Sequence, residues 1–191
     1  MTEDIETRHT NFDKSPASHR RSWHKDPLLI LTIPAILAVD QLTKFVVTQS
    51  LGLGQSWPAE GFFRFTYGLN TGTAFGLLPN QTTLLIIASF VAIGFLVYFY
   101  RSHAMPSRLL RLAIGLQLGG AFGNLIDRLR SGAVVDFIDV GPWPIFNIAD
   151  SSIVVGMAIL ITVLILGDIK QKEAPSDSTE AEPSGSQDDS E

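Results

Sequence analysis

"TLLIIASFVAIGFLVYFY", residues 83–100, contains no charged side chain. A helix needs ~20 mostly apolar residues to cross the hydrocarbon core of a membrane. A helix on the surface of a soluble protein would instead carry polar residues along an outward stripe. This segment has almost none, so we interpret it as a membrane-spanning helix.

Three other segments have a similar length and apolar character: residues 28–47, 109–126 and 148–166. The first of them does not fit a cleaved signal peptide, because a long polar stretch precedes it and no small-residue cleavage site follows. The sequence therefore predicts an all-α polytopic membrane protein. Its four transmembrane helices form one domain, residues 27–169.

The two ends of the chain differ sharply from this domain in composition. Residues 1–26 and 170–191 are rich in charged residues, Ser, Thr and Pro, and cannot bury enough apolar surface to fold alone. We expect both to be disordered. Much of the net charge of −5 comes from the acidic C-terminal tail, and no basic patch is present, so nucleic acid is not an expected partner.

Basic residues near the helix ends predict the orientation in the membrane, because cytoplasmic loops carry an excess of Lys and Arg. They flank the first, second and fourth segments: Arg20, Arg21, Lys25, Arg101, Arg108, Arg111, Lys170 and Lys172. This bias puts both termini in the cytoplasm. Residues 48–82 and 127–147 then face outward.

The outward stretches contain two strand-like runs. "EGFFRFTYGLN", residues 60–70, alternates in a period of two that predicts a short strand with one aromatic face. The sequence from Asn70 to Gly72 then reads as a turn. "SGAVVDFIDV", residues 131–140, is the second run. We expect a small extracytoplasmic β-element.

Charged side chains at membrane depth are costly, so each is a candidate functional residue. Asp40 and Lys44 are spaced i, i+4 and are interpreted as a structural ion pair. Asn124 and Arg128 have the same spacing. Together with Asp127 they could also form an ordinary helix end with a local salt bridge.

Three acids follow in the stretch from residue 134 to residue 152. Asp136 and Asp139 point to opposite faces if the chain is extended, so at most one of them can share a site with Asp150. The pattern does not say which one. Asn147 with Asp150 is also typical of a helix N-cap, so capping and catalysis are both open for this pair.

Histidine- and cysteine-based hydrolysis can be excluded. All four histidines lie in the N-terminal tail or the cytoplasmic loop, and the chain has no cysteine. Only carboxylates remain on the outward face. Two neighbouring carboxylates share a proton and titrate as a pair, so that one can act as a base on water and the other as an acid. This chemistry requires neither metal nor cofactor.

Five motifs in order resemble those of lipoprotein signal peptidase, also called signal peptidase II: "DQLTK" (40–44), "NTGTAFG" (70–76), "GNLIDR" (123–128), "VVDFID" (134–139) and "FNIADSS" (146–152). The resemblance covers about residues 28–168. It implies an aspartic endopeptidase of the bacterial cytoplasmic membrane, with its active site near the extracytoplasmic face. Such an enzyme removes signal peptides from diacylglyceryl-modified prolipoproteins, cutting just before the lipidated Cys.

The resemblance also implies roles for individual residues. The catalytic pair would be Asp136 and Asp150. The residues that support the site or hold substrate would be Asp40, Lys44, Asn70, Gly72, Asn124, Asp127, Arg128 and Asn147. No metal ligand or cofactor is implied. The expected partners are the prolipoprotein substrates and membrane lipids, and a monomer is expected.

The competing interpretation is a small non-enzymatic transporter or assembly subunit that uses its intramembrane carboxylates as an ion relay. A transporter predicts acids near the bilayer midplane and often a repeat between its halves. Here the acids cluster at one end of the spans, and the sequence has no evident repeat. A presenilin-like protease would carry a Gly-x-Gly-Asp motif, which is absent.

Overall fold

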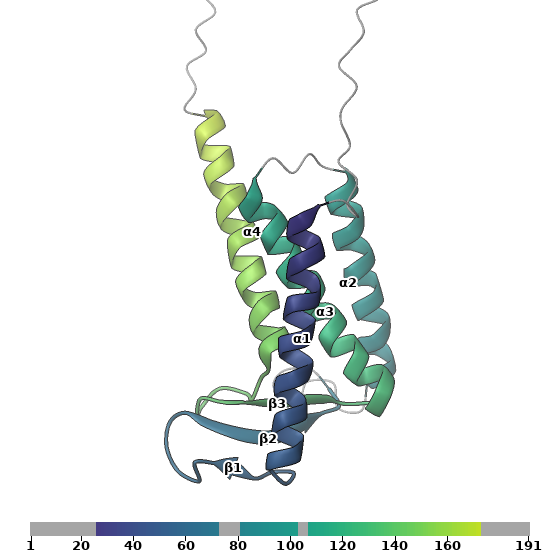
Figure 1. Ribbon diagram of the computed structural model, residues 1–191. Helices are drawn as coiled ribbons and strands as arrows, with labels where there is room; N and C mark the ends of the chain where they lie inside the picture. Colours follow the sequence, from purple (N-terminus) through teal and green to yellow (C-terminus); the bar gives the residue numbers. More distant parts are fainter. Residues whose placement is uncertain (1–25, 73–80, 103–106, 173–191) are drawn as a thin grey trace, which may run out of the picture.

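The computed structural model describes residues 26–72, 81–102 and 107–172 of the chain (Figure 1). Its helices are α1 (Pro27–Ser50), α2 (Thr82–Ser102), α3 (Arg108–Ser131) and α4 (Ile148–Lys172). All four are long and apolar enough to span a membrane. The predicted four-helix membrane fold is confirmed. The helices extend beyond the predicted spans because hydropathy does not register their polar terminal turns.

Asp26 belongs to the helical bundle, although it falls in the segment 1–26 that was expected to be disordered. Its buried carboxylate caps α1 by accepting the backbone N–H of Leu28 at 3.1 Å. It also accepts the hydroxyl of Tyr100 from α2 at 2.7 Å and pairs with Arg111 of α3 at 3.3 Å. One side chain therefore joins three helices.

The C-terminal boundary of the helical domain also differs from the predicted one. Helix α4 continues to Lys172, into the segment 170–191 that was expected to be a disordered tail. The remaining parts of the two predicted tails, residues 1–25 and 173–191, lie outside the described residues.

Helix α3 is the central helix of the bundle and packs against the other three. In the most apolar 18-residue stretch of α3, 67% of the residues are buried inside the protein. The corresponding share in the other helices is 6% to 17%, and their large apolar side chains face outward. Glycines allow the close approach. A Cβ atom at Gly119 would lie 2.9 Å from the Cβ of Ile36 in α1, and one at Gly115 would lie 3.0 Å from that of Thr32. The absence of side chains at these two positions therefore permits the close contact between α1 and α3.

Replacing Gly119 with Ala should therefore loosen the contact between α1 and α3. We expect the free energy of unfolding to fall by about 1–3 kcal/mol, the usual cost of overpacking a close contact. Gly94→Ala is the matched control, because a Cβ atom at this α2 position meets nothing within 4 Å. Unfolding midpoints in detergent would measure both variants. An equal effect of the two substitutions would contradict this account of the packing.

A three-stranded antiparallel sheet lies at the end of the bundle where α1 finishes and α4 begins (Figure 1). Its strands are β1 (Ser56–Trp57), β2 (Arg64–Asn70) and β3 (Val134–Asp139), in that order across the sheet. The two predicted strands are present. The sequence did not predict β1, because two residues are too few to show an alternating pattern.

Candidate active site

Strand β3 and the first turn of α4 bring Asp136 and Asp150 together beside the last turns of α3. Asp136 is buried in β3, opposite Gly68 of β2. Asp150 is half-buried and follows the N-cap of α4 by three residues. The charge of Asp150 acts on Asp136, so the two carboxylates are electrostatic neighbours.

Two amide side chains link the two carboxylates. The Nδ2 atom of Asn147 donates to Oδ1 of Asp136 at 2.7 Å and to Oδ1 of Asn124 at 3.1 Å. The Nδ2 atom of Asn124 in turn donates to Oδ1 of Asp150 at 2.7 Å. This chain of hydrogen bonds fixes the orientation of both carboxylates.

Asn147 also caps α4, because its Oδ1 atom accepts the backbone N–H of Asp150 at 2.9 Å. Of the two roles that the sequence left open for this pair, the structure shows the cap. The same side chain faces Asp136 through its other atom, so capping and a place in the site are not alternatives. An ionised Asp at position 147 could cap the helix equally well but would have no hydrogen to donate to Asp136.

The predicted turn after β2 directs a second amide to Asp136. The Oδ1 atom of Asn70 accepts the backbone N–H of Gly72 at 2.9 Å. This leaves Nδ2 of Asn70 to donate to Oδ2 of Asp136 at 2.9 Å. Each oxygen of Asp136 therefore accepts a hydrogen bond from an amide side chain.

The electrostatic environment distinguishes Asp136 from Asp139. Burial raises the pKa of Asp136 to about 6, and the charge of Asp150 adds to this rise. Burial also opposes ionisation of Asp139, but hydrogen bonds from Thr66 and Gly141 and the charge of Arg64 hold its pKa below the ordinary value. Asp139 pairs with Arg64 at 2.7 Å. The fold thus brings Asp136, rather than Asp139, to Asp150.

The raised pKa of Asp136 should make stability depend on pH. The folded state binds the proton of Asp136 more tightly than the unfolded chain, whose carboxyl has an ordinary pKa near 3.8. This stabilisation is complete below that pKa and is lost as the pH rises through about 6. Unfolding midpoints of the wild type should therefore fall over this interval relative to those of Asp136→Asn. If the unfolding midpoints of the two proteins changed with pH in parallel, the raised pKa of Asp136 would be contradicted.

A cluster of charged residues supports the pair from α1 and α3. Lys44 Nζ lies 2.8 Å from Oδ2 of Asp40, so the predicted i, i+4 ion pair is present. It also lies 2.7 Å from Oδ2 of Asp127 and 3.2 Å from Oδ1 of Asn124. The local salt bridge considered for the end of α3 is therefore replaced by one to α1. Arg128 donates to the backbone oxygen of Asn124 at 3.5 Å and is close enough to the pair to interact with both charges.

Gln41 is a residue of this cluster that the sequence did not single out. Its Nε2 atom donates to Oδ1 of Asp127 at 2.9 Å and to Oδ2 of Asp40 at 3.3 Å. The sequence analysis selected charged side chains at membrane depth, and the neutral amide of Gln41 does not meet this criterion. Its place in "DQLTK" next to Asp40 was the available clue.

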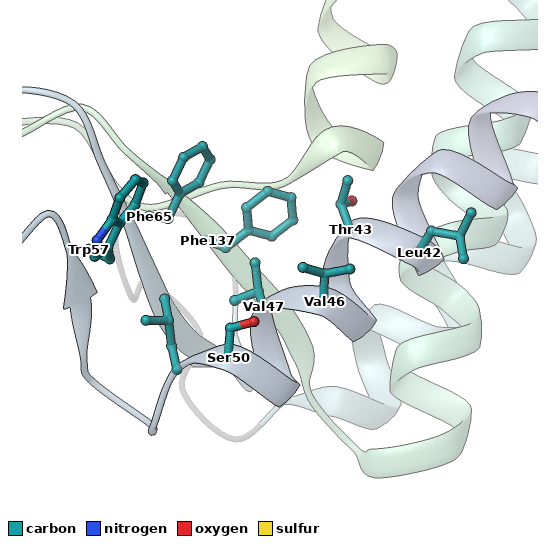
Figure 2. Close-up of a pocket in the computed structure, with 9 residues that line it drawn as sticks. Leu42, Thr43, Val46, Val47, Ser50, Trp57, Phe65 and Phe137 are labelled. Atoms are coloured by element: carbon teal, nitrogen blue, oxygen red, sulfur yellow. The ribbon is translucent and has the colours of Figure 1, made fainter.

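An apolar pocket of about 560 Å³ lies between the last turns of α1 and the sheet (Figure 2). Leu42 and Val46 of α1 line one side, and Phe65, Phe137 and Trp57 line the other. Phe137 follows Asp136 in an extended strand, so the two side chains point to opposite sides. None of the described residues that line the pocket carries a carboxylate, and neither Asp136 nor Asp150 is among them.

Comparison with known proteins gives concordant results. Residues 32–166 match the family model described as signal peptidase (SPase) II. The lipoprotein signal peptidase of Moorella thermoacetica is 43% identical over 150 residues, which cover 78% of this chain and 99% of the relative. That of Syntrophotalea carbinolica is 45% identical over 142 residues, 70% and 88% of the two chains. A solved bacterial membrane enzyme superposes with a TM-score of 0.70 at 36% identity, covering 78% of this chain and 93% of that one.

Proposed function

The chain belongs to the signal peptidase II family and removes signal peptides from prolipoproteins, and we propose that Asp136 and Asp150 catalyse the hydrolysis. The observation that carries this proposal is the hydrogen-bonded chain from Asp136 through Asn147 and Asn124 to Asp150. Asp139 has its own partners in Arg64 and Thr66 and is not part of that chain.

In this proposal the pair holds one proton between its two carboxylates. The ionised carboxylate takes a proton from a water molecule as the water oxygen attacks the scissile carbonyl carbon. The protonated carboxyl donates its proton toward the carbonyl oxygen. As the tetrahedral intermediate collapses, the C–N bond breaks and the amide nitrogen leaves as an amine with the proton of the carboxyl that was protonated in the first step. One hydroxyl of the intermediate gives its proton to the other carboxylate, so the pair again holds one proton. Asn70, Asn124 and Asn147 keep the carboxylates in place throughout.

We further propose that the substrate is a diacylglyceryl-modified precursor and that cleavage occurs just before the lipidated Cys. The acidic pair lies where α4 begins and the sheet closes the bundle, at one end of the membrane-spanning helices. A peptide bond next to a lipid-bearing residue is held at that depth by its acyl chains. We propose that the protease domain extends over residues 26–172. We also propose that the enzyme acts as a monomer surrounded by membrane lipids.

Purified protein incubated with a lipid-modified prolipoprotein would test this proposal. We expect a shorter product whose new N-terminus is the lipidated Cys, identified by mass spectrometry. The same precursor without its lipid is the control and should be cut much more slowly. Efficient cleavage of both precursors, or cleavage at another bond, would contradict the proposed specificity.

The protein is a multi-pass membrane protein. We propose that both termini lie in the cytoplasm and that the acidic pair lies near the extracytoplasmic face of the bacterial inner membrane. The start of α1, the end of α2, the start of α3 and the end of α4 all lie at the end of the bundle away from the sheet (Figure 1). Arg101 and Arg108 are at this end, as expected for a cytoplasmic loop.

Reporter fusions would test this orientation. A reporter that works only after export should be inactive when joined at position 104 or after residue 172. A fusion at position 54, in the turn before β1, should be active. The reverse result would invert the topology.

A further inference from the structure

Two backbone amides next to the catalytic pair are held by the side chains of other acids. Oδ1 of Asp40 accepts the N–H of Ala149 at 3.0 Å, and Oδ2 of Asp127 accepts the N–H of Val135 at 3.4 Å. Ala149 directly precedes Asp150, and Val135 directly precedes Asp136. Asp40 and Asp127 therefore each hold the segment that carries one member of the pair.

The two supporting acids are in turn held together from α1. Lys44 contacts Oδ2 of both carboxylates, at 2.8 and 2.7 Å. Gln41 bridges the same two groups through Nε2, and also lies 3.4 Å from the backbone oxygen of Gly123. Asp40 is fully buried and Asp127 is 8% exposed. One lysine charge thus faces two buried negative charges, and the amide of Gln41 supplies further donors without adding a charge.

We propose that Gln41 is a positioning residue that sets the spacing between Asp136 and Asp150 by holding Asp40 and Asp127 together. The inference rests on the proposed catalytic pair. Without the Gln41 amide, Lys44 alone would oppose the repulsion between the two supporting carboxylates. Their separation would increase, and β3 and the start of α4 would move apart with them. Proton transfer within a pair depends steeply on such distances.

Gln41→Met tests this, because it keeps the length of the side chain and removes its donors. We expect kcat to fall by about 10-fold, within the range that small misplacements of catalytic groups produce. KM should stay close to that of the wild type. The unfolding midpoint should change little, since the ion pairs of Lys44 remain. Thr48→Val is the control: it removes a donor to the backbone of the same helix, at an exposed site away from the cluster.

The pH profile of kcat gives a second signature. The charged groups that act on Asp136 or face it from the neighbouring helices are Asp150 of α4, Lys44 of α1 and Arg128 of α3. If Asp136 and Asp150 lie farther apart in Gln41→Met, their charges interact less. The interval between the two apparent pKa values of the pair should therefore narrow. A residue that only stabilises the fold would leave this interval unchanged.

Gln41→Glu is a second variant that keeps the test decisive if Gln41→Met folds poorly. A protonated Glu retains one donor, whereas an ionised Glu adds a third negative charge to the cluster. Its activity relative to the wild type should be higher at pH 5.5 than at pH 8. An unchanged kcat, a raised KM, or an unaltered pH profile in both variants would overturn the inference. Normal cleavage by Asp136→Asn or Asp150→Asn would instead refute the proposed pair itself.

Discussion

Asp136→Asn and Asp150→Asn should each lower kcat by about 10²–10⁴-fold, the contribution expected of a general acid or base. Asn has nearly the size of Asp, so packing around β3 and α4 should survive. Each substitution removes one ionisable member of the pair, which then cannot supply both the base and the acid. The variants should still accumulate in the membrane and bind the lipid-modified precursor. Cleavage of purified precursor would measure the loss.

Asp139→Asn is the matched control for this prediction, since it makes the same change three residues along the same strand. Its partners are Arg64 and Thr66 rather than the pair, so cleavage should largely persist even if the unfolding midpoint falls. The double variant of Asp136 and Asp150 should be little worse than either single variant, because residues that act as a unit are not additive. If Asp136→Asn or Asp150→Asn still cleaved the precursor while Asp139→Asn did not, the catalytic residue would be Asp139, on the other face of β3.

Lys44→Met should have the largest effect on folding. Lys44 is 4% exposed and lies between the buried carboxylates of Asp40 and Asp127. Removing one partner from a buried ion pair leaves an uncompensated charge and costs about 3–5 kcal/mol. We expect a much lower yield in the membrane and a lower unfolding midpoint in detergent.

Arg64→Met is the control for Lys44→Met. The side chain of Arg64 is 30% exposed, and Asp139 keeps its hydrogen bonds from Thr66 and from the backbone N–H of Gly141, so the loss of stability should be smaller. Adding Asp127→Asn to Lys44→Met should recover part of the stability, because it removes one of the two negative charges left behind. A Lys44→Met protein with an unchanged midpoint would show that Asp40 and Asp127 do not need the lysine.

Features within one segment could be predicted from the sequence. Hydropathy located the four helices, the i, i+4 spacing located the pair of Asp40 and Lys44, and the cap pattern located Asn147 at the start of α4. Each of these depends on the geometry of a single helix. The strand pattern left Asp136 and Asp139 open, and only the likeness of the motifs favoured Asp136.

Contacts between segments could not be predicted in this way. The second partner of Lys44 is Asp127, more than eighty residues away, and no local period links the two. From the sequence, replacing Asp40 with Ala would leave Lys44 unpaired at depth. With Asp127 beside it, Lys44 keeps one carboxylate, and the variant loses instead the contact to Ala149 in α4. Asp26 was assigned to a disordered segment because its partners come from α2 and α3.

Buried charges connect α1 to α3 at both ends of the bundle. Asp26 meets Arg111 near the start of the two helices, and Lys44 meets Asp127 near their ends. Sliding one helix along the other would break both contacts, so the hydrophobic length of this pair is fixed. A bilayer of a different thickness must then adapt by deforming its lipids or by tilting the bundle as a whole. In the orientation proposed above, the depth of the acidic pair relative to the membrane surface would thus be set jointly by the protein and by the bilayer thickness, and the cleavage of the proposed lipid-anchored substrates would be sensitive to both.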